Sequence, residues 1–163
     1  LLGSLRLDEE IALRIGLAHT SSHVGDEYAE RTGRERINYT REELLVGGSW
    51  RFAPHWRVYG ELASAYDLRN EALQEEGRWQ LGLEYERPQG LWGTRIGWYA
   101  ALDAEGMEER DWEADLSAQI GLKLPSESRD WRLGVAWYDG RVPVGEFFQH
   151  EEQYLAFGLW LDI

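Results

Sequence analysis

Near the start of the chain, a histidine and a serine have the types and the spacing needed for acyl-transfer chemistry. His19, Ser21 and His23 alternate with other residues, so on an extended strand they share one face. A serine nucleophile needs a base within reach and a third group that orients the base. Glu42 and Asn38, in the next segment of the same type, are candidates for that third group.

Whether these groups meet depends on how the two segments pair. A connection centred near residue 30 permits two registers of an antiparallel hairpin. One sets His19 opposite Glu42 and Ser21 opposite Thr40, and the other sets His19 opposite Thr40 and Ser21 opposite Asn38. Opposed Cβ atoms lie ~5 Å apart and same-face neighbours ~7 Å apart, within reach of these side chains. Ser21 would then attack an acyl ester, His19 would accept its proton, and Glu42 or Asn38 would hold the imidazole tautomer.

The same residues also have a non-catalytic interpretation. If the strands extend beyond the hydrocarbon of a bilayer, His19, Ser21 and Thr40 form an ordinary polar rim among the headgroups. An enzyme would further need to stabilise the oxyanion, through a bound Ca²⁺ or through backbone N–H groups near Gly25. The acidic segment 103–111 is another place for Ca²⁺ or Mg²⁺ bridging lipid phosphates, although its spacing matches no defined calcium loop.

The elements that must position these residues are strands. Alternation of polar and apolar residues dominates the chain and predicts eight strands. Tight connections at 53–55, 88–90 and 124–128 alternate with longer polar ones, as in an up-and-down barrel with one short-turn rim and one loop rim. The predicted strands are 10–23, 36–52, 56–68, 77–87, 91–102, 111–123, 130–139 and 150–163.

The two faces of these strands predict which side meets the barrel interior. One face carries large apolar side chains, and the other carries glycine, alanine and mixed charges. An eight-stranded barrel has little room inside, so the apolar face should point outward to lipid, with Trp at its ends as an aromatic girdle. The expected outward residues are Leu81, Leu83, Leu116, Ile120, Leu133, Val135, Phe157 and Leu159; the expected inward ones are Arg14, Arg57, Glu61, Arg95 and Asp115.

These patterns predict an all-β fold, an eight-stranded antiparallel up-and-down transmembrane β-barrel. Residues 1–163 form its single domain, and the last strand closes against the first. The soluble alternative is a lipocalin-like barrel with an apolar cavity. The sequence contains no run of about 18 apolar residues, so it predicts no transmembrane helix. The start of the chain lacks a basic region followed by an apolar one, so either a signal peptide has been removed or none existed.

The composition argues against some classes of partner and of site. The net charge is −13, which argues against nucleic acid as a partner. The chain has no cysteine, so disulfides and thiolate metal sites are excluded. Nine Trp and eight Tyr are rich for this length and suit the interfaces of a membrane barrel.

Two segments carry a resemblance to a known family. HTSSHVGDEY at 19–28 and YDGRVPVGEF at 138–147, with the closing strand 153–163, resemble a bacterial family catalogued as domain of unknown function 1207. The resemblance spans the whole chain and implies a bacterial outer-membrane location, without an assigned activity. The chain ends in Ile163, whereas barrels delivered to the outer-membrane insertion machinery usually end in Phe or Trp.

The pair His19 and Ser21 carries a second resemblance. It is similar to the His-x-Ser that lipid A 3-O-deacylase and outer-membrane phospholipase A place on the outer wall of a barrel. Those enzymes have Asn after the serine, where this chain has Ser22. The placement of Glu42 or Asn38 beside the pair comes from the register and not from the resemblance.

Two functions follow as hypotheses. The first is a small outer-membrane barrel with a binding or structural role through its acidic loops and outer wall, with the lipid bilayer, lipopolysaccharide or a protein as its partner. The second is an outer-leaflet lipid acyl-ester hydrolase that uses Ser21, His19 and Glu42 or Asn38 on the barrel exterior, with or without Ca²⁺.

Overall fold

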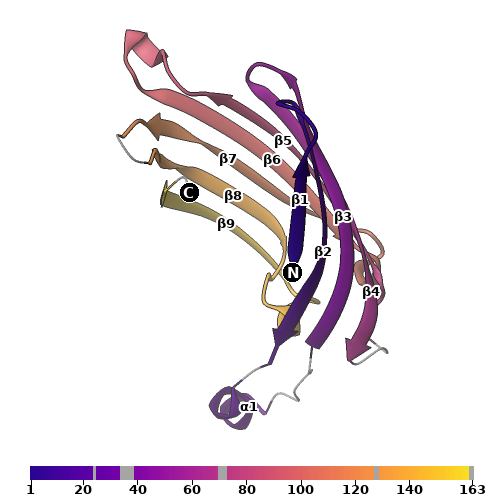
Figure 1. The fold of residues 1–163 in the computed structure, drawn as a ribbon. Coiled ribbons are helices and arrows are strands. Elements are labelled where there is room, and N and C mark those ends of the chain that lie inside the picture. Colours follow the sequence, from indigo (N-terminus) through magenta and orange to yellow (C-terminus); the bar gives the residue numbers. More distant parts are fainter. Residues whose placement is uncertain (24, 34–38, 70–72, 127–128, 162–163) are drawn as a thin grey trace.

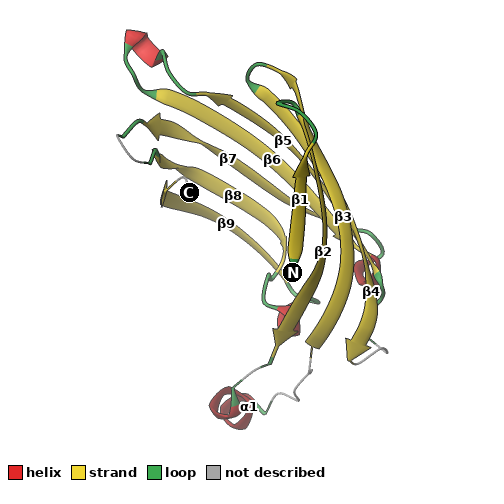
Figure 2. Cartoon of the chain, in the orientation of Figure 1, coloured by secondary structure: helices red, strands yellow, loops and turns green. Residues whose placement is uncertain are grey.

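The chain folds into one curved antiparallel sheet (Figures 1 and 2). This computed structural model describes residues 1–23, 25–33, 39–69, 73–126 and 129–161. Its strands are β1 (Leu2–Arg6), β2 (Ile11–Ser22), β3 (Tyr39–Ala53), β4 (Trp56–Arg69), β5 (Gly77–Arg87), β6 (Gly97–Met107), β7 (Ala114–Leu124), β8 (Trp131–Arg141) and β9 (Glu151–Leu161). The helix α1 (Asp26–Thr32) and the 3-10 turns η1 (Leu91–Gly93), η2 (Glu108–Arg110) and η3 (Gly145–Phe147) lie between strands.

Every strand pairs with its neighbours in the sequence, so the predicted all-β, up-and-down antiparallel topology is confirmed. Connections at one rim join β1 to β2, β3 to β4, β5 to β6 and β7 to β8. The opposite rim, called here the loop rim, carries α1, η2, η3 and the connection between β4 and β5. Figure 1 shows α1 beyond this rim, at the lower end of the sheet.

The prediction of a closed eight-stranded barrel is wrong: within the described residues the sheet has nine strands and is not closed. The missed strand is β1, which pairs with β2 from Leu2 opposite Gly16 to Arg6 opposite Ala12. The carboxylate of Asp8 makes this hairpin possible, because it accepts hydrogen bonds from the backbone N–H groups of Glu10 and Ile11 at 2.8 and 2.7 Å. β1 thus takes the edge of β2 that was assigned to the last strand, and β9 pairs with β8 alone.

β6, at Gly97–Met107, is shifted from the predicted strand 91–102. Residues 91–96, expected to begin it, form η1 and a turn, in which Gly90 and Gly93 adopt positive φ angles of 96° and 72°. The strand instead runs on through Asp103 and Glu105, which had been assigned to an acidic loop. Both acidic side chains point to the inner face, where they have polar partners.

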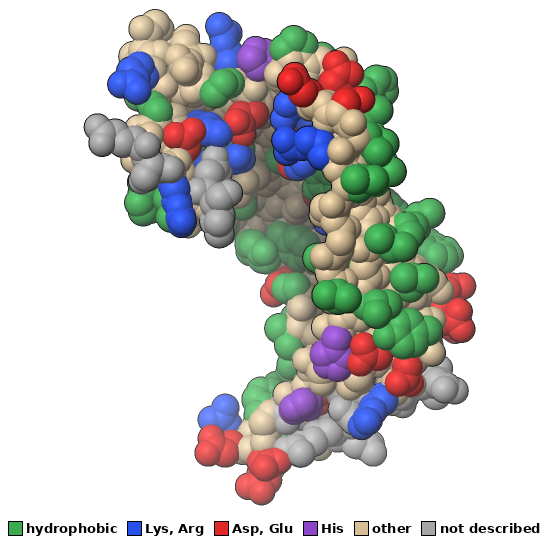
Figure 3. Space-filling model, viewed as in Figure 1, with side chains coloured by type: hydrophobic (Ala, Val, Ile, Leu, Met, Phe, Trp, Pro, Cys, Tyr) green, Lys and Arg blue, Asp and Glu red, His purple; other side chains and the backbone are tan. Residues whose placement is uncertain are grey.

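The two faces of the sheet differ as predicted. Large apolar side chains are exposed on the outer, convex face, including Leu81, Leu116, Ile120, Leu133, Phe157 and Leu159. Figure 3 shows apolar side chains along the outer flank and charged ones inside the hollow of the curved sheet. Arg41, Glu43, Glu61 and Asp115 are buried on the inner face. The described residues therefore form no apolar cavity of the lipocalin type on that face.

At the loop rim, the two sides of the hollow are joined by the connection between β8 and β9. Its turn η3 contacts β2 and β3. The Glu146 N–H lies 3.4 Å from Ser22 Oγ, and the rings of Tyr39 and Phe148 are 5.4 Å apart. Both aromatic side chains are buried, so this contact fixes the curvature of the sheet at the loop rim.

None of the helices among the described residues has the length and hydrophobicity to cross a bilayer.

Candidate functional site

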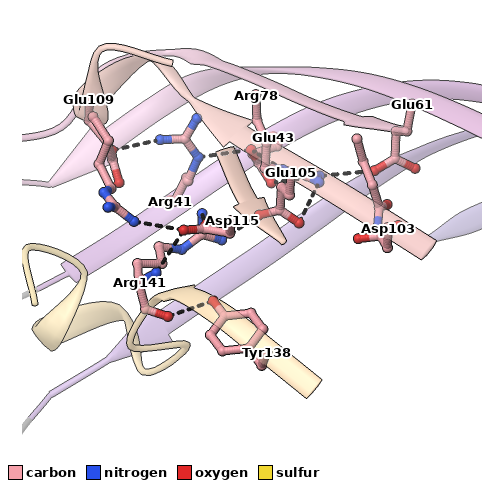
Figure 4. A network of polar contacts seen from close by, with 12 residues as sticks. Arg41, Glu43, Glu61, Arg78, Asp103, Glu105, Glu109, Asp115, Tyr138 and Arg141 are labelled. Atoms are coloured by element: carbon pink, nitrogen blue, oxygen red, sulfur yellow. Dashed lines mark hydrogen bonds and ion pairs between the residues drawn. The ribbon is translucent and has the colours of Figure 1, made fainter. Parts of the chain in front are cut away.

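The inner face is built from paired charges that converge near the loop rim (Figure 4). Arg41, on β3, has a side chain only 2% exposed. Its Nε donates to Glu43 Oε1 at 2.8 Å, and its Nη1 lies 3.2 Å from Glu109 Oε2. The same guanidinium donates to the backbone carbonyls of Glu75 and Glu76 at 2.6 and 2.7 Å, so it ties β3 to the β4–β5 connection and to η2.

Further arginines extend this network across the sheet. Arg78 pairs with Glu43 at 3.2 Å and with Glu61 at 3.0 Å, and Glu61 also pairs with Arg14 from β2. Asp115 on β7 accepts from Arg110 Nη1 at 2.7 Å and from the Arg141 N–H at 2.7 Å. The guanidinium of Arg141 also bonds Glu105 on β6. A buried charge is tolerated when it is paired and hydrogen-bonded in this way.

Glu109 and Arg110 are members of the network that lie outside the strands, in η2. Glu109 is the acidic one. Burial raises the pKa of its carboxyl above the ordinary value, against the opposing effect of Arg41. Its two oxygens contact Tyr39 Oη at 3.2 Å and Arg41 Nη1 at 3.2 Å. Its main observable role is thus to hold the start of β3.

The predicted inward residues have mixed outcomes. Arg14 pairs with Glu61, and Arg57 pairs with Glu84 at 2.7 Å, as expected. Asp115 is inside and fully engaged. The prediction for Arg95 is wrong, because residue 95 lies in the β5–β6 turn and is exposed. Arg41, Arg110 and Glu109 were not expected; their positions at strand ends and in a turn hid them from an argument based on alternation alone.

The outer face has an aromatic belt near the short-turn rim. Successive ring contacts link Trp50 to Phe52 at 5.8 Å, Phe52 to Trp56 at 6.4 Å, Trp56 to Tyr85 at 4.9 Å and Tyr85 to Trp98 at 4.5 Å. These residues come from β3, β4, β5 and β6, so the belt crosses four strands at one level. Amphipathic rings at one level are typical of a surface where apolar and aqueous surroundings meet.

The structure selects one of the two registers for the β2–β3 hairpin. His19 is opposite Glu42, Ser21 is opposite Thr40, and Leu17 is opposite Leu44. His19 Nδ1 and Glu42 Oε1 are 2.6 Å apart, and the His19 side chain is 58% exposed. The register that set Ser21 opposite Asn38 is therefore wrong, while Asn38 itself lies outside the described residues.

Ser21 lies on the outer face with His19 and is exposed. Within the described ranges, no hydrogen bond joins its hydroxyl to His19. Because the imidazole uses Nδ1 for Glu42, Nε2 is left directed away from that carboxylate. The geometry thus holds a base and its orienting group together, with a serine two residues along the same strand. Gly25 immediately precedes α1, whose Tyr28 and Ala29 N–H groups bond its carbonyl at 3.1 and 3.2 Å.

This polar patch lies where the outer apolar surface ends. Leu17 and Leu44, the pair next to it toward the sheet centre, are 44% and 48% exposed. On the other side of β3, Glu42 is opposite the exposed Asp67 of β4. Among the described residues, no group of three or more His, Asp or Glu side chains is arranged to hold a metal ion.

Comparison with known proteins gives one positive result. Neither the curated proteins nor the solved structures contain a match to the chain. The family model described as "Protein of unknown function (DUF1207)" matches residues 1–162. The chain therefore belongs to the DUF1207 family of proteins of unknown function.

Proposed function

We propose that this chain forms the wall of a bacterial outer-membrane β-barrel, with a binding or structural role carried by its outer surface and acidic loops. The observation that supports it most is the inverted distribution of side chains. Leu62, Ile120 and Phe157 are 64%, 58% and 81% exposed, whereas Arg41 and Glu43 are 1% and 4% exposed. Soluble proteins rarely expose apolar patches beyond a few hundred Å², and lipid is the surrounding that favours such a surface.

The aromatic belt gives independent support. It lies at the end of the apolar outer surface, at the level where a barrel passes from hydrocarbon to headgroups. The polar patch of His19, Glu42, Ser21 and Thr40 ends the apolar surface toward the loop rim. The bilayer is accordingly the proposed partner, and lipopolysaccharide is the proposed contact of the loop rim.

A pair of lysine substitutions on one strand tests the membrane proposal. Ile120→Lys puts a charge near the middle of β7, and Leu116→Lys puts it four residues nearer the loop rim on the same face. At the bilayer midplane the change should cost about 2–4 kcal/mol of folding free energy, and near the interface about 0–1 kcal/mol. Urea unfolding of the protein refolded into phospholipid vesicles measures both. Equal, small effects would contradict the proposal.

The contact between His19 and Glu42 favours a second candidate function, hydrolysis of a lipid acyl ester. Ser21 Oγ would attack the ester carbonyl while its proton passes to His19 Nε2. The protonated imidazole, held by Glu42, would then donate that proton to the departing alcohol oxygen. Water would hydrolyse the acyl-serine in a second step with His19 as base. The placement on the outer face suits a substrate that diffuses in the membrane plane.

Two matched variants test this candidate. Ser21→Ala should abolish release of fatty acid from phospholipid vesicles by the refolded protein, and Thr40→Ala, its cross-strand neighbour, should leave the rate unchanged. Glu42→Gln should lower kcat by weakening the orientation of the imidazole. Release that is absent from the wild type, or unaffected by Ser21→Ala, would leave the structural and binding role as the function.

A further inference from the structure

The outer face of β5–β9, with Trp56 at the start of β4, carries an apolar groove of about 490 Å³. Its floor is formed by two small residues, Ala100 on β6 and Ala118 on β7. Ala100 is opposite Tyr85 and Ile120, and Ala118 is opposite Leu102 and Trp137, so each alanine is surrounded by large side chains. The groove thus arises because two outward-facing residues are alanines, whereas the residues around them have aromatic or branched side chains.

Almost the whole lining is hydrophobic or aromatic; Gln119 is the one polar lining residue among those described. An extended peptide would leave its N–H and C=O groups without partners in such a groove. A hydrocarbon chain has no such groups and can fill the groove through packing contacts alone. The lining therefore favours an alkyl chain as the occupant.

One end of the groove offers a positive charge. Arg87 is the last residue of β5, two positions beyond Tyr85 on the outer face, and its cross-strand partner is Trp98. Tyr85 and Trp98 both line the groove. Arg87 is exposed, and in the described part of the chain it makes no ion pair. The His55 ring lies 5.8 Å from that of Tyr85, at the same rim. The Arg87 guanidinium lies beside Gly90 of the β5–β6 turn, beyond the rim end of the groove. A guanidinium at that end matches the anionic head of an amphiphile whose chain lies in the groove.

We propose that this groove holds an acyl chain of a membrane phospholipid, whose phosphate is bound by Arg87. The inference rests on the proposed membrane function and adds a specific lipid site to it. The aromatic belt places Trp56, Tyr85 and Trp98 where the chain would emerge toward its headgroup. The site lies on the strands β5–β9, away from the His19 patch on β2 and β3 (Figure 1).

Native mass spectrometry of the protein extracted from phosphatidylglycerol vesicles tests the proposal. The wild type should retain one phospholipid. Ala100→Phe and Ala118→Phe fill the floor and should each abolish retention. Ala104→Phe is the matched control, because Ala104 lies on the outer face of β6 between Leu81 and Leu116 but outside the groove. Circular dichroism identifies a floor variant that fails to fold. The other floor variant then still tests the site.

The headgroup contact is tested separately. Arg87→Ala should weaken retention about fivefold, the factor equivalent to the ~1 kcal/mol that one basic residue contributes near anionic lipid. Arg31→Ala, the same charge change on α1 at the loop rim, should have no effect.

The outcomes separate this inference from the membrane proposal. A folded protein that does not insert into vesicles overturns both. A protein that inserts, but retains phospholipid equally in the wild type and in the folded floor variants, overturns the lipid site alone. A groove occupied by a second copy would appear as a dimer that Ala100→Phe dissociates, and it would also overturn the lipid site.

Discussion

Arg41 shows how this sheet accommodates charge on its inner face. One buried guanidinium serves two carboxylates and two backbone carbonyls, from β3, η2 and the β4–β5 connection. The neighbouring charges are shared in the same way, since Glu43 bonds both Arg41 and Arg78. The inner face is therefore held by interlocking ion pairs together with a few buried apolar side chains, such as Tyr39, Tyr99 and Phe148.

Removing Arg41 should destabilise the protein strongly. Arg41→Met keeps much of the volume but leaves Glu43 and Glu109 buried with one partner fewer. Loss of one partner of a buried ion pair costs about 3–5 kcal/mol. Urea unfolding in vesicles should show a loss of this size, while Arg6→Met on the exposed strand β1 should change the free energy of unfolding little. A similar small change for both variants would mean that the network does not hold the loop rim together.

The residue-level predictions from sequence succeeded where alternation continues without interruption. Arg14 and Arg57 belong to the regular strands β2 and β4, and both have the partner type expected. Arg95 failed because Gly90 and Gly93 allow a longer turn than the sequence suggested. The partners of Arg41 were out of reach of such reasoning, since they come from a loop and a 3-10 turn whose positions depend on the folded chain.

At the level of elements, the β2–β3 hairpin illustrates what the sequence does determine. The outward residues are odd-numbered in β2 and even-numbered in β3. Together with the length of the connection, this allowed two registers, and one of them is observed. The pairing of β1 was missed because the strand has only five residues. Its turn also depends on a single local interaction, the hydrogen bonds that the Asp8 carboxylate accepts. The start of β6 was missed because residues 91–96 carry strand-like residue types but form a turn.

Glycines opposite each other on β7 and β8 give a prediction at this level. Gly121 and Gly134 are paired, and the ring of Tyr99 from β6 covers both. A Cβ added to Gly121 would lie 2.8 Å from Tyr99 Cε1 and closer still to the Leu133 carbonyl oxygen, so the strands would have to shift. Gly121→Ala should therefore lower the free energy of unfolding by about 1–3 kcal/mol.

A second glycine serves as the control. A Cβ at Gly60 on β4 would meet its nearest atoms at 3.6 and 3.8 Å, which is ordinary contact. Gly60→Ala should be neutral by the same unfolding measurement. Equal losses in the two variants would show that the effect comes from the strand conformation and not from the close approach under Tyr99.

In the part of the chain that the structure describes, the sheet has two unpaired edges, β1 and β9, on either side of the open hollow (Figure 1). Hydrocarbon provides no partner for backbone N–H and C=O groups, and each unsatisfied group costs several kcal/mol there. If the sheet is membrane-embedded, both edges must pair, either with each other or with another chain. The edge amides of β1 and β9 should then exchange slowly in vesicles and rapidly in denaturing detergent. Rapid exchange of both edges in folded, vesicle-bound protein would contradict membrane embedding.

The order of the strands and the character of their faces could be predicted from the sequence, but the closure of the sheet could not. Alternation predicted the antiparallel order and the inverted faces, because these depend on neighbouring strands. Closure depends on the summed twist and curvature of all the strands and on the number of strands, and the unexpected β1 changed that number.

A spin-label scan of β7 shows whether the outer face of the sheet meets lipid. The chain has no native cysteine, so each single cysteine variant along Ala114–Leu124 carries one label. In vesicles, collision with oxygen, which partitions into hydrocarbon, should peak at 116, 118, 120 and 122 and fall at 117, 119 and 121. A water-soluble nickel relaxant should be excluded from the outward positions. Outward positions that favour the nickel reagent over oxygen would mean that the outer face meets water and not lipid.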